Sequence, residues 1–147
     1  MRVRELKVEY RPRQDLPAYD GRKPLTSPRE AADFIRPILE NEPVEVFIVV
    51  CLSTKLRVLC YHELSRGCLD GTTVHPREVF KAAILGNAGA VILGHNHPSG
   101  DPSPSPDDAA LTRRFVECGE LLGIQVVDSI IIGDGNYYSF KETGRFR

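Results

Sequence analysis

The spacing of apolar positions predicts three helices after residue 26. Each begins with a proline at its first helical position, Pro28, Pro76 or Pro106, where the missing N–H costs no hydrogen bond. Pro37 should kink or shorten the first helix. The side chains that share a face of each helix, and should be buried, are Phe34, Ile35, Ile38 and Leu39 in the first, Val79, Phe80, Ala83 and Ile84 in the second, and Leu111, Phe115, Cys118 and Leu122 in the third.

Apolar, largely β-branched runs between the helices predict strands. In chain order they are EVFIVVCL over 45–52, its hairpin return LRVLCYHEL over 56–64, the fully apolar AGAVILG over 88–94, IQVVDSIIIG over 124–133, and YYSF over 137–140. We expect the third run to lie in the middle of a sheet, because it has no polar side. The order of elements predicts a single three-layer α/β domain over residues 27–147, with a mixed sheet between helices.

The first 26 residues predict an N-terminal strand or arm followed by a connector. Val3, Leu6, Val8 and Tyr10 partly follow strand alternation, and the polar stretch PAYDGRKPLT is typical of a linker. We therefore place the start of the domain at residue 27.

Composition restricts the class of protein. The chain has 147 residues and a net charge of −1, so no global field favours nucleic acid or an anionic membrane. Arg113 and Arg114 form only a small basic pair. No apolar run approaches the roughly 20 residues that span a bilayer, and the basic N-terminus has no signal-peptide centre. We expect a cytoplasmic protein.

The four cysteines give no metal or disulfide framework. Cys51, Cys60, Cys68 and Cys118 never form a C-x-x-C pair and stand in apolar or mixed surroundings. We expect ordinary buried or half-buried thiols, because free cysteine behaves as a small hydrophobe.

The chemistry concentrates in GHNHPSGDPSPSPDD, residues 94–108. His95 and His97 follow a buried strand and point to the same side of it, and two imidazoles need at least one further ligand to hold zinc. Asp108 is the nearest candidate, since it lies in the first turn of the next helix. Each of the two motifs, taken alone, also has an ordinary structural role: H-x-H can be a surface histidine pair, and Ser105-x-x-Asp108 can be only a capping box at the helix start. The two together favour a metal site.

Such a site would leave one zinc position open for water, whose pKa zinc lowers to about 7. A carboxylate outside the ligand set must then move the proton. Glu45 is nominated because it begins the first core strand, although a solvated strand end is the commoner role of that position. Glu63 and Glu78 remain alternatives, the latter less favoured because it fits the first turn of its own helix.

These motifs resemble the JAMM metalloprotease signature, in which a distant Glu precedes H-x-H, seven residues and S-x-x-D. VHPREVFKAAILGNAGAVILGHNHPSG, DSIIIGDGNYYSF and KETG narrow the resemblance to the RadC family of JAB/MPN domains, over roughly residues 27–145. The resemblance implies a cytidine deaminase-like architecture, a Zn²⁺ ion bound by His95, His97 and Asp108, oxyanion stabilisation by Ser105, and Glu45 as general acid and base.

The chain departs from the family pattern at two points. Full-length members carry an N-terminal helix-hairpin-helix region that these residues do not contain, so we expect no DNA binding by that route. Asp128-Ser129-Ile130 replaces the usual D-H-I and removes a histidine that could support the site or contact substrate. The deaminase ligands H-x-E and P-C-x-x-C are also missing, so base deamination does not follow.

The leading hypothesis is a zinc hydrolase that cleaves a peptide or isopeptide bond in a peptide or protein substrate. A DNA-repair or recombination accessory protein with a structural or vestigial metal site is the alternative, although no basic stripe with interleaved aromatics supports nucleic-acid binding. A metal-free scaffold is a third possibility, disfavoured by the intact ligand set. The sequence identifies neither the substrate nor the oligomeric state.

Overall fold

A computed structural model describes residues 1–67 and 74–146, and within them the chain forms a mixed five-stranded sheet in the order β2-β1-β3-β4-β5 with three helices. The elements are α1 Pro28–Leu39, β1 Val46–Leu52, β2 Val58–Arg66, α2 Pro76–Leu85, β3 Ala90–Asn96, α3 Pro106–Leu122, β4 Gln125–Ile132 and β5 Tyr137–Ser139. The α/β fold predicted from the sequence is confirmed.

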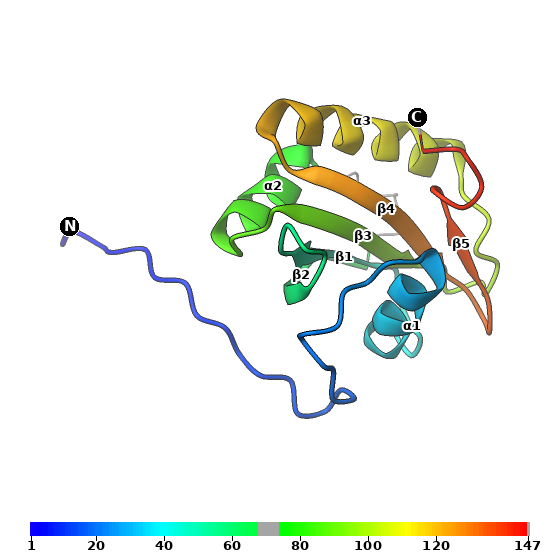
Figure 1. The fold of residues 1–147 in the computed structure, drawn as a ribbon, viewed down its shortest axis with the longest axis horizontal. Helices are drawn as coiled ribbons and strands as arrows, with labels where there is room; N and C mark the ends of the chain where they lie inside the picture. Colours follow the sequence, from blue (N-terminus) through cyan, green and yellow to red (C-terminus); the bar gives the residue numbers. More distant parts are fainter. Residues whose placement is uncertain (68–73, 147) are drawn as a thin grey trace.

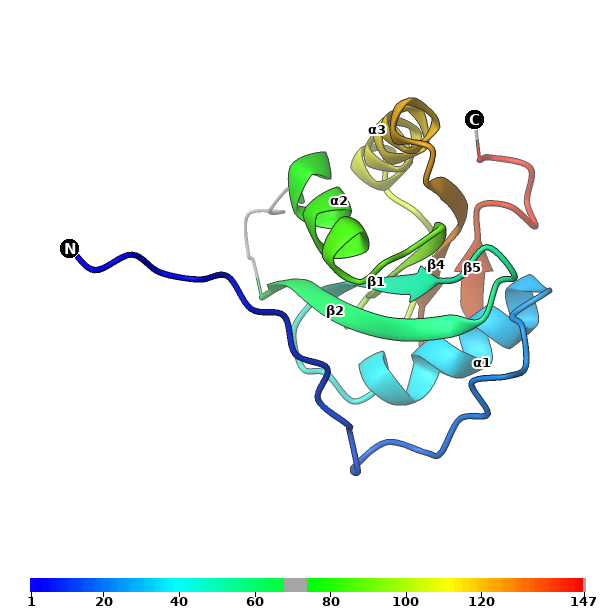
Figure 2. The same cartoon turned by 60° about the vertical axis from the view of Figure 1, so that its left-hand side comes forward.

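The domain has three layers. Figures 1 and 2 show α1 on one face of the sheet and α2 with α3 on the other. Two apolar clusters match these layers: Ile35 and Leu39 of α1 pack with one side of the central strands, while Phe80 of α2 and Phe115 of α3 pack with the other. β1 and β3 are buried along their whole length, and β3 is the middle strand of the sheet, as its fully apolar sequence predicted.

The connection between β3 and β4 sets the position of α3. β3 pairs with β1 in antiparallel fashion, with Phe47 opposite His95, and with β4 in parallel fashion, with Leu93 opposite Ser129. A parallel pair needs a crossover connection, and here α3 provides it. The helix therefore begins near the end of β3 and returns the chain to the start of β4.

The buried face of α3 differs from the predicted one at three of the four predicted positions, while Phe115 is buried as predicted. Leu122 is 50% exposed, and Leu111 and Cys118 are only half-buried. The buried residues are Ala109, Thr112, Phe115, Val116 and Gly119. A Cβ at Gly119 would lie 2.4 Å from the carbonyl oxygen of Ile124, so the helix approaches the following strand too closely for a large side chain. Small residues line this contact. The sequence-based prediction relied on large apolar residues and therefore placed the buried face of α3 about a quarter turn away around the helix axis.

The predicted inward face of α2 is right at three positions and wrong at one. Val79, Phe80 and Ala83 are buried, whereas Ile84 is 59% exposed. Ile84 follows Ala83 by about 100° around the helix axis and lies in the last turn, beyond the narrow stripe that meets the sheet.

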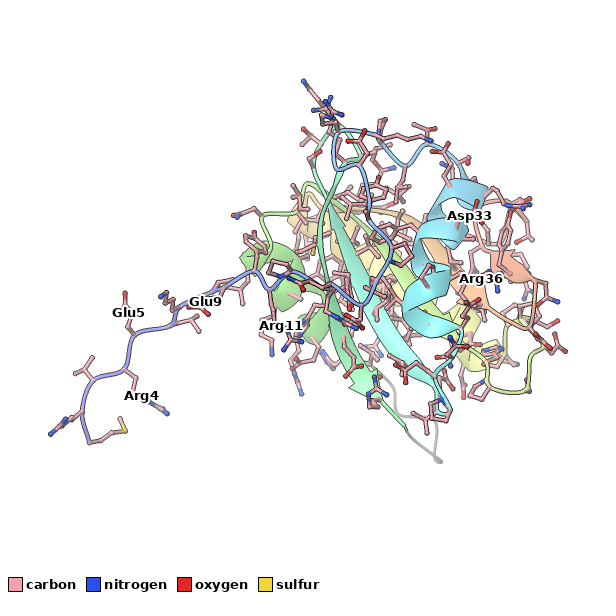
Figure 3. All side chains as sticks on the ribbon, turned by 90° about the horizontal axis from the view of Figure 1, so that it is seen from below. Arg4, Glu5, Glu9, Arg11, Asp33 and Arg36 are labelled. Carbon is pink, nitrogen blue, oxygen red and sulfur yellow. The ribbon has the colours of Figure 1, made fainter. Side chains whose placement is uncertain are left out.

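The N-terminal segment is an arm and not a strand. Residues 1–23 contain no strand although all of them are described, and Val3 is 99% exposed. Figure 3 shows Arg4, Glu5 and Glu9 along the arm, clear of the domain that the arm approaches near Arg11. A strand needs a neighbour to complete its backbone hydrogen bonds, and no described strand pairs with this segment. The partial alternation therefore gave a wrong strand prediction.

Three cysteines match the prediction of unpaired, covered thiols. Cys51 is buried, and Cys60 and Cys118 are half-buried. Cys68 lies outside the described residues. Across the portion of the chain that the structure describes, no helix is long and apolar enough to cross a membrane.

We predict that Phe115→Ala lowers the free energy of unfolding by about 3–5 kcal/mol, because it opens a cavity where Phe47 and Phe115 meet edge to face. Leu122→Ala, at a position that the sequence also predicted to be buried but that is half exposed, should stay within about 0.5 kcal/mol of wild type. Urea unfolding of both variants measures the difference. Equal losses would contradict the helix orientation.

Candidate metal centre

The end of β3 presents two imidazoles on the side of the sheet covered by α2 and α3. His95 lies within the strand, and its ring stacks on Phe47 with an interplanar angle of 9°. His97 follows the strand, but its backbone N–H still donates to the carbonyl of Ile132, 3.0 Å away. The ladder to β4 thus continues past the strand end, and the two rings lie with centroids 5.1 Å apart.

The proline-rich loop returns the chain from His97 to α3. Gly100 has φ +90, a conformation that side-chain-bearing residues rarely adopt. Its carbonyl accepts a hydrogen bond from the backbone of Asp134 at 2.8 Å. This bond ties the loop to the turn between β4 and β5, so the first part of the loop is anchored at this end of the sheet.

The N-terminus of α3 fixes Asp108 in place. Ser105 is the N-cap residue, and its Oγ accepts from the Asp108 backbone N–H at 3.0 Å. The Asp108 carboxylate in turn accepts from the Ser105 backbone N–H at 2.9 Å. Each donor would otherwise be unsatisfied at a helix start, and the pair forms a complete capping box.

The same carboxylate also faces both histidines. Asp108 Oδ2 lies 3.2 Å from His97 Nε2, and Asp108 Oδ1 lies 3.5 Å from His95 Nε2. The cap and the contact with the imidazoles therefore use one side chain, and neither excludes the other.

Glu45 joins this cluster from the start of β1. Its Oε1 lies 4.0 Å from His95 Nε2, and its side chain is 46% exposed. Taken together, one ligand atom from each of Glu45, His95, His97 and Asp108 lies within 4.8 Å of every other. The structure thus brings together four of the five predicted site residues in one group, with Ser105 adjoining through its cap.

The rival carboxylates lie outside this group. Glu63 pairs with Arg66 at 2.6 Å, and Glu78 pairs with Lys81 at 2.6 Å. The strand register explains why Glu45 lies beside the histidines. Because Phe47 is opposite His95, Glu45, two residues before Phe47, comes to the end of the sheet where the histidines lie.

Hydrogen bonding defines the ligand atom of His97. Its Nδ1 lies 2.9 Å from the carbonyl oxygen of Asp101, which can only accept, so Nδ1 carries the proton and Nε2 faces Asp108. The hydrogen bond to Asp108 raises the pKa of His97 above its usual value. Burial opposes ionisation of Asp108, but its contacts with His95 and His97 hold the pKa of that carboxyl below its usual range. The cluster therefore favours a positive charge beside the Asp108 carboxylate.

His95 supplies the strongest sign that a cation belongs here. Its side chain is 3% exposed, and neither ring nitrogen has a hydrogen-bond partner among the described residues. An unpaired polar atom in a protein interior costs roughly 1–3 kcal/mol. A divalent cation at Nε2 would satisfy that nitrogen, and the set of two imidazoles and one carboxylate fits the ligand preferences of zinc.

Asn96 is a functional position that sequence reasoning missed. Its side chain points away from the histidines, accepts from the Val46 N–H at 2.7 Å and donates to the Val44 carbonyl at 2.9 Å. These bonds bracket Glu45, so Asn96 holds the backbone that carries the carboxylate. The alternation of a strand indicates that Asn96 points to the other face, but not what it meets there.

Ser129, at the position of the family's histidine, is buried in β4. Its Oγ has no hydrogen-bond partner within the described part of the chain, while its backbone N–H donates to Asp128. Asp128 also accepts from Ser139 Oγ at 2.6 Å, and so joins β4 to the end of β5. A 1% exposed side chain at position 129 is not accessible to a substrate.

The fold and this cluster define a JAB-type domain, and comparisons with known proteins agree. A model of the RadC-like JAB domain matches residues 25–145. A UPF0758 protein of Pelobacter propionicus is 50% identical over 120 residues, which cover 82% of this chain and 52% of that protein. A UPF0758 protein of Methanosarcina barkeri is 45% identical over 128 residues, covering 87% of this chain and 56% of that protein.

The chain belongs to the RadC-like JAB domain family. It spans about half the length of the curated relatives it matches.

We predict that Asn96→Ala lowers the free energy of unfolding by about 2–3 kcal/mol, because the buried N–H of Val46 and the partly buried carbonyl of Val44 lose their partner. Asn41→Ala, an exposed change in the same loop, should have little effect. Thermal and urea unfolding of the two variants provide the test. Equal stability of Asn96→Ala and wild type would show that Asn96 does not hold this segment.

Proposed function

We propose that this domain is a zinc-dependent hydrolase that cleaves a peptide or isopeptide bond. His95, His97 and Asp108 would hold the ion, and the buried unpaired nitrogens of His95 carry the proposal. Membership of a JAB family, whose domains include metalloproteases, supports the same chemistry. Zinc, when bound, supplies Lewis acidity and lowers the pKa of a water molecule in an open position to about 7.

Glu45 is the group that moves the proton. It is the most exposed member of the cluster, and its Oε1 lies 4.0 Å from a nitrogen that binds zinc in this proposal. A carboxylate there takes a proton from the attacking water and returns it to the leaving amine.

Ser105 stabilises the oxyanion in this scheme. The capping box uses Ser105 Oγ as an acceptor, so the hydroxyl hydrogen remains available to donate. A donor fixed by a helix cap is already oriented before negative charge develops on the substrate carbonyl, which is the condition for electrostatic stabilisation of a transition state.

The substrate is a peptide or protein amide that reaches the site from the side of Glu45. His95 is enclosed and Asp108 is largely covered, whereas nearly half of the Glu45 side chain faces solvent. An extended chain can therefore approach Glu45 and the helix start together. A peptide library identifies which amide is cut.

We predict that Glu45→Gln retains stoichiometric zinc and loses cleavage of the peptide library by about 10²–10⁴-fold, because only the proton-transfer group is removed. His95→Ala should lose both zinc and cleavage. Glu63→Gln is the matched control, since Glu63 is an exposed glutamate paired with Arg66 and lies outside the cluster.

Full activity of zinc-loaded Glu45→Gln would overturn the assignment of the base. Zinc binding by wild type without any cleavage would favour the alternative of a binding protein with a structural metal.

We also predict a pH dependence of zinc binding. Zinc must displace the proton from His97, whose pKa is raised above its usual value by its hydrogen bond to Asp108. As the pH falls through this raised pKa, zinc affinity should drop about tenfold per unit for each displaced proton. Chelator competition between about pH 5 and 8 measures the profile. An affinity that stays constant until well below pH 6.5 would contradict the role of His97.

A further inference from the structure

A pair of cysteines lies at the other end of the sheet from the metal centre. Cys51 of β1 and Cys60 of β2 are direct partners in the antiparallel register. We propose that these two thiols form a redox-active dithiol site, which a hydroperoxide converts into a disulfide between β1 and β2. The proposal does not depend on hydrolase activity.

The backbone places the two residues within bridging range. Directly opposed residues of an antiparallel pair have Cα atoms about 4.5–5.5 Å apart. A disulfide requires a Cα separation of about 4.4–6.8 Å, so closure needs side-chain rotation and no displacement of the strands.

Both sulfur atoms meet at Gly86, the residue that ends α2. A Cβ at Gly86 would lie 3.0 Å from Cys51 Sγ and 3.0 Å from Cys60 Sγ, so the sulfurs are at most twice that distance apart. Gly86 has no side chain, and both thiols project into the space beside it. The two side chains therefore lie on the same side of the sheet and converge.

The two thiols differ in access. Cys51 is 1% exposed, and its Sγ donates to the Ala82 carbonyl at 3.9 Å. Cys60 is half-buried and lines a groove of about 1070 Å³ between the N-terminal arm, β2 and α2. A small oxidant can therefore reach Cys60 first, while Cys51 is placed to resolve the product.

The electrostatics agree with these roles. The interaction with the Cys51 side chain lowers the pKa of Cys60 to about 7, and the same interaction raises the pKa of Cys51. The thiolate is the nucleophilic form of cysteine, so Cys60 is the sulfur that reacts.

The reaction balances with hydrogen peroxide as the oxidant. The Cys60 thiolate attacks one oxygen, the O–O bond breaks, and the sulfur becomes a sulfenic acid while the other oxygen leaves as hydroxide and takes a proton. Cys51 sulfur then attacks Cys60 sulfur, the S–O bond breaks, and the thiol proton leaves with that oxygen as water. Two thiols are oxidised, one peroxide is reduced, and two water molecules form.

This site is separate from the metal centre. Cys51 of β1 lies six residues beyond Glu45, which directly precedes that strand, so the two are about 20 Å apart at 3.3 Å per residue. The group of four possible ligands contains neither cysteine. Closing the disulfide should therefore leave zinc content unchanged.

The test uses the 147-residue chain with Cys68→Ser and Cys118→Ser, in which Cys51 and Cys60 are the two remaining cysteines. Stoichiometric hydrogen peroxide should reduce the titratable thiols from two to none, remove the mass of two hydrogens, and give a peptide that links Cys51 to Cys60. Dithiothreitol should restore both thiols, and thermal unfolding of the oxidised form should shift upward because the link constrains the unfolded chain. Zinc content should be the same in both forms.

Two further variants in that background separate the roles of the sulfurs. Cys51→Ser should leave a Cys60 sulfenic acid that dimedone labels, whereas Cys60→Ser should leave Cys51 unlabelled because it is buried. Oxygen addition to the parent without loss of two hydrogens, or a link that forms only between two protein molecules, would overturn the proposal. So would equal dimedone labelling of the two variants.

Discussion

The reciprocal hydrogen bonds between Ser105 and Asp108 are the interaction on which the candidate metal centre depends. They fix a carboxylate at the first turn of α3, where it faces His95 and His97 without a flexible approach. The helix is itself placed by the parallel pairing of β3 with β4, because its chain must cross from the end of one strand to the start of the other. The parallel pairing of β3 with β4 thus sets the distance between the histidines at the end of β3 and Asp108 at the start of α3, the proposed ligands.

Strand alternation provides the second support. His95 points toward α3, and Asn96, its neighbour, points to the opposite face and binds the backbone on both sides of Glu45. Two consecutive residues of β3 therefore control both parts of the site: one contributes a ring nitrogen, and the other holds the segment that carries the proposed base. A substitution of Asn96 can therefore alter the position of Glu45 although Asn96 itself does not contact the histidines.

Sequence predicted the features that depend on local physics. Proline at the first turn, serine caps and apolar runs identified the helices and strands, and the H-x-H pair with Ser105-x-x-Asp108 identified the cluster. Features that depend on a close approach between elements or on strand register could not be predicted from the sequence. The predicted buried face of α3 was largely wrong because Gly119 packs against a backbone carbonyl, a contact that no local pattern indicates. Glu45 and Glu63 remained alternative candidates for the base because the choice depends on the strand register, which places Phe47 opposite His95. The partners of Asn96 are distant in sequence and left no local signal.

The central claim is that His95, His97 and Asp108 bind one zinc ion. Anomalous diffraction at the zinc absorption edge, from crystals of the zinc-loaded protein, tests it most directly. The account predicts a single strong peak about 2.0–2.2 Å from both histidine Nε2 atoms and an Asp108 oxygen, with Glu45 outside the ligand shell. A peak at the cysteines or at another histidine, with this cluster empty in zinc-loaded crystals, would contradict it.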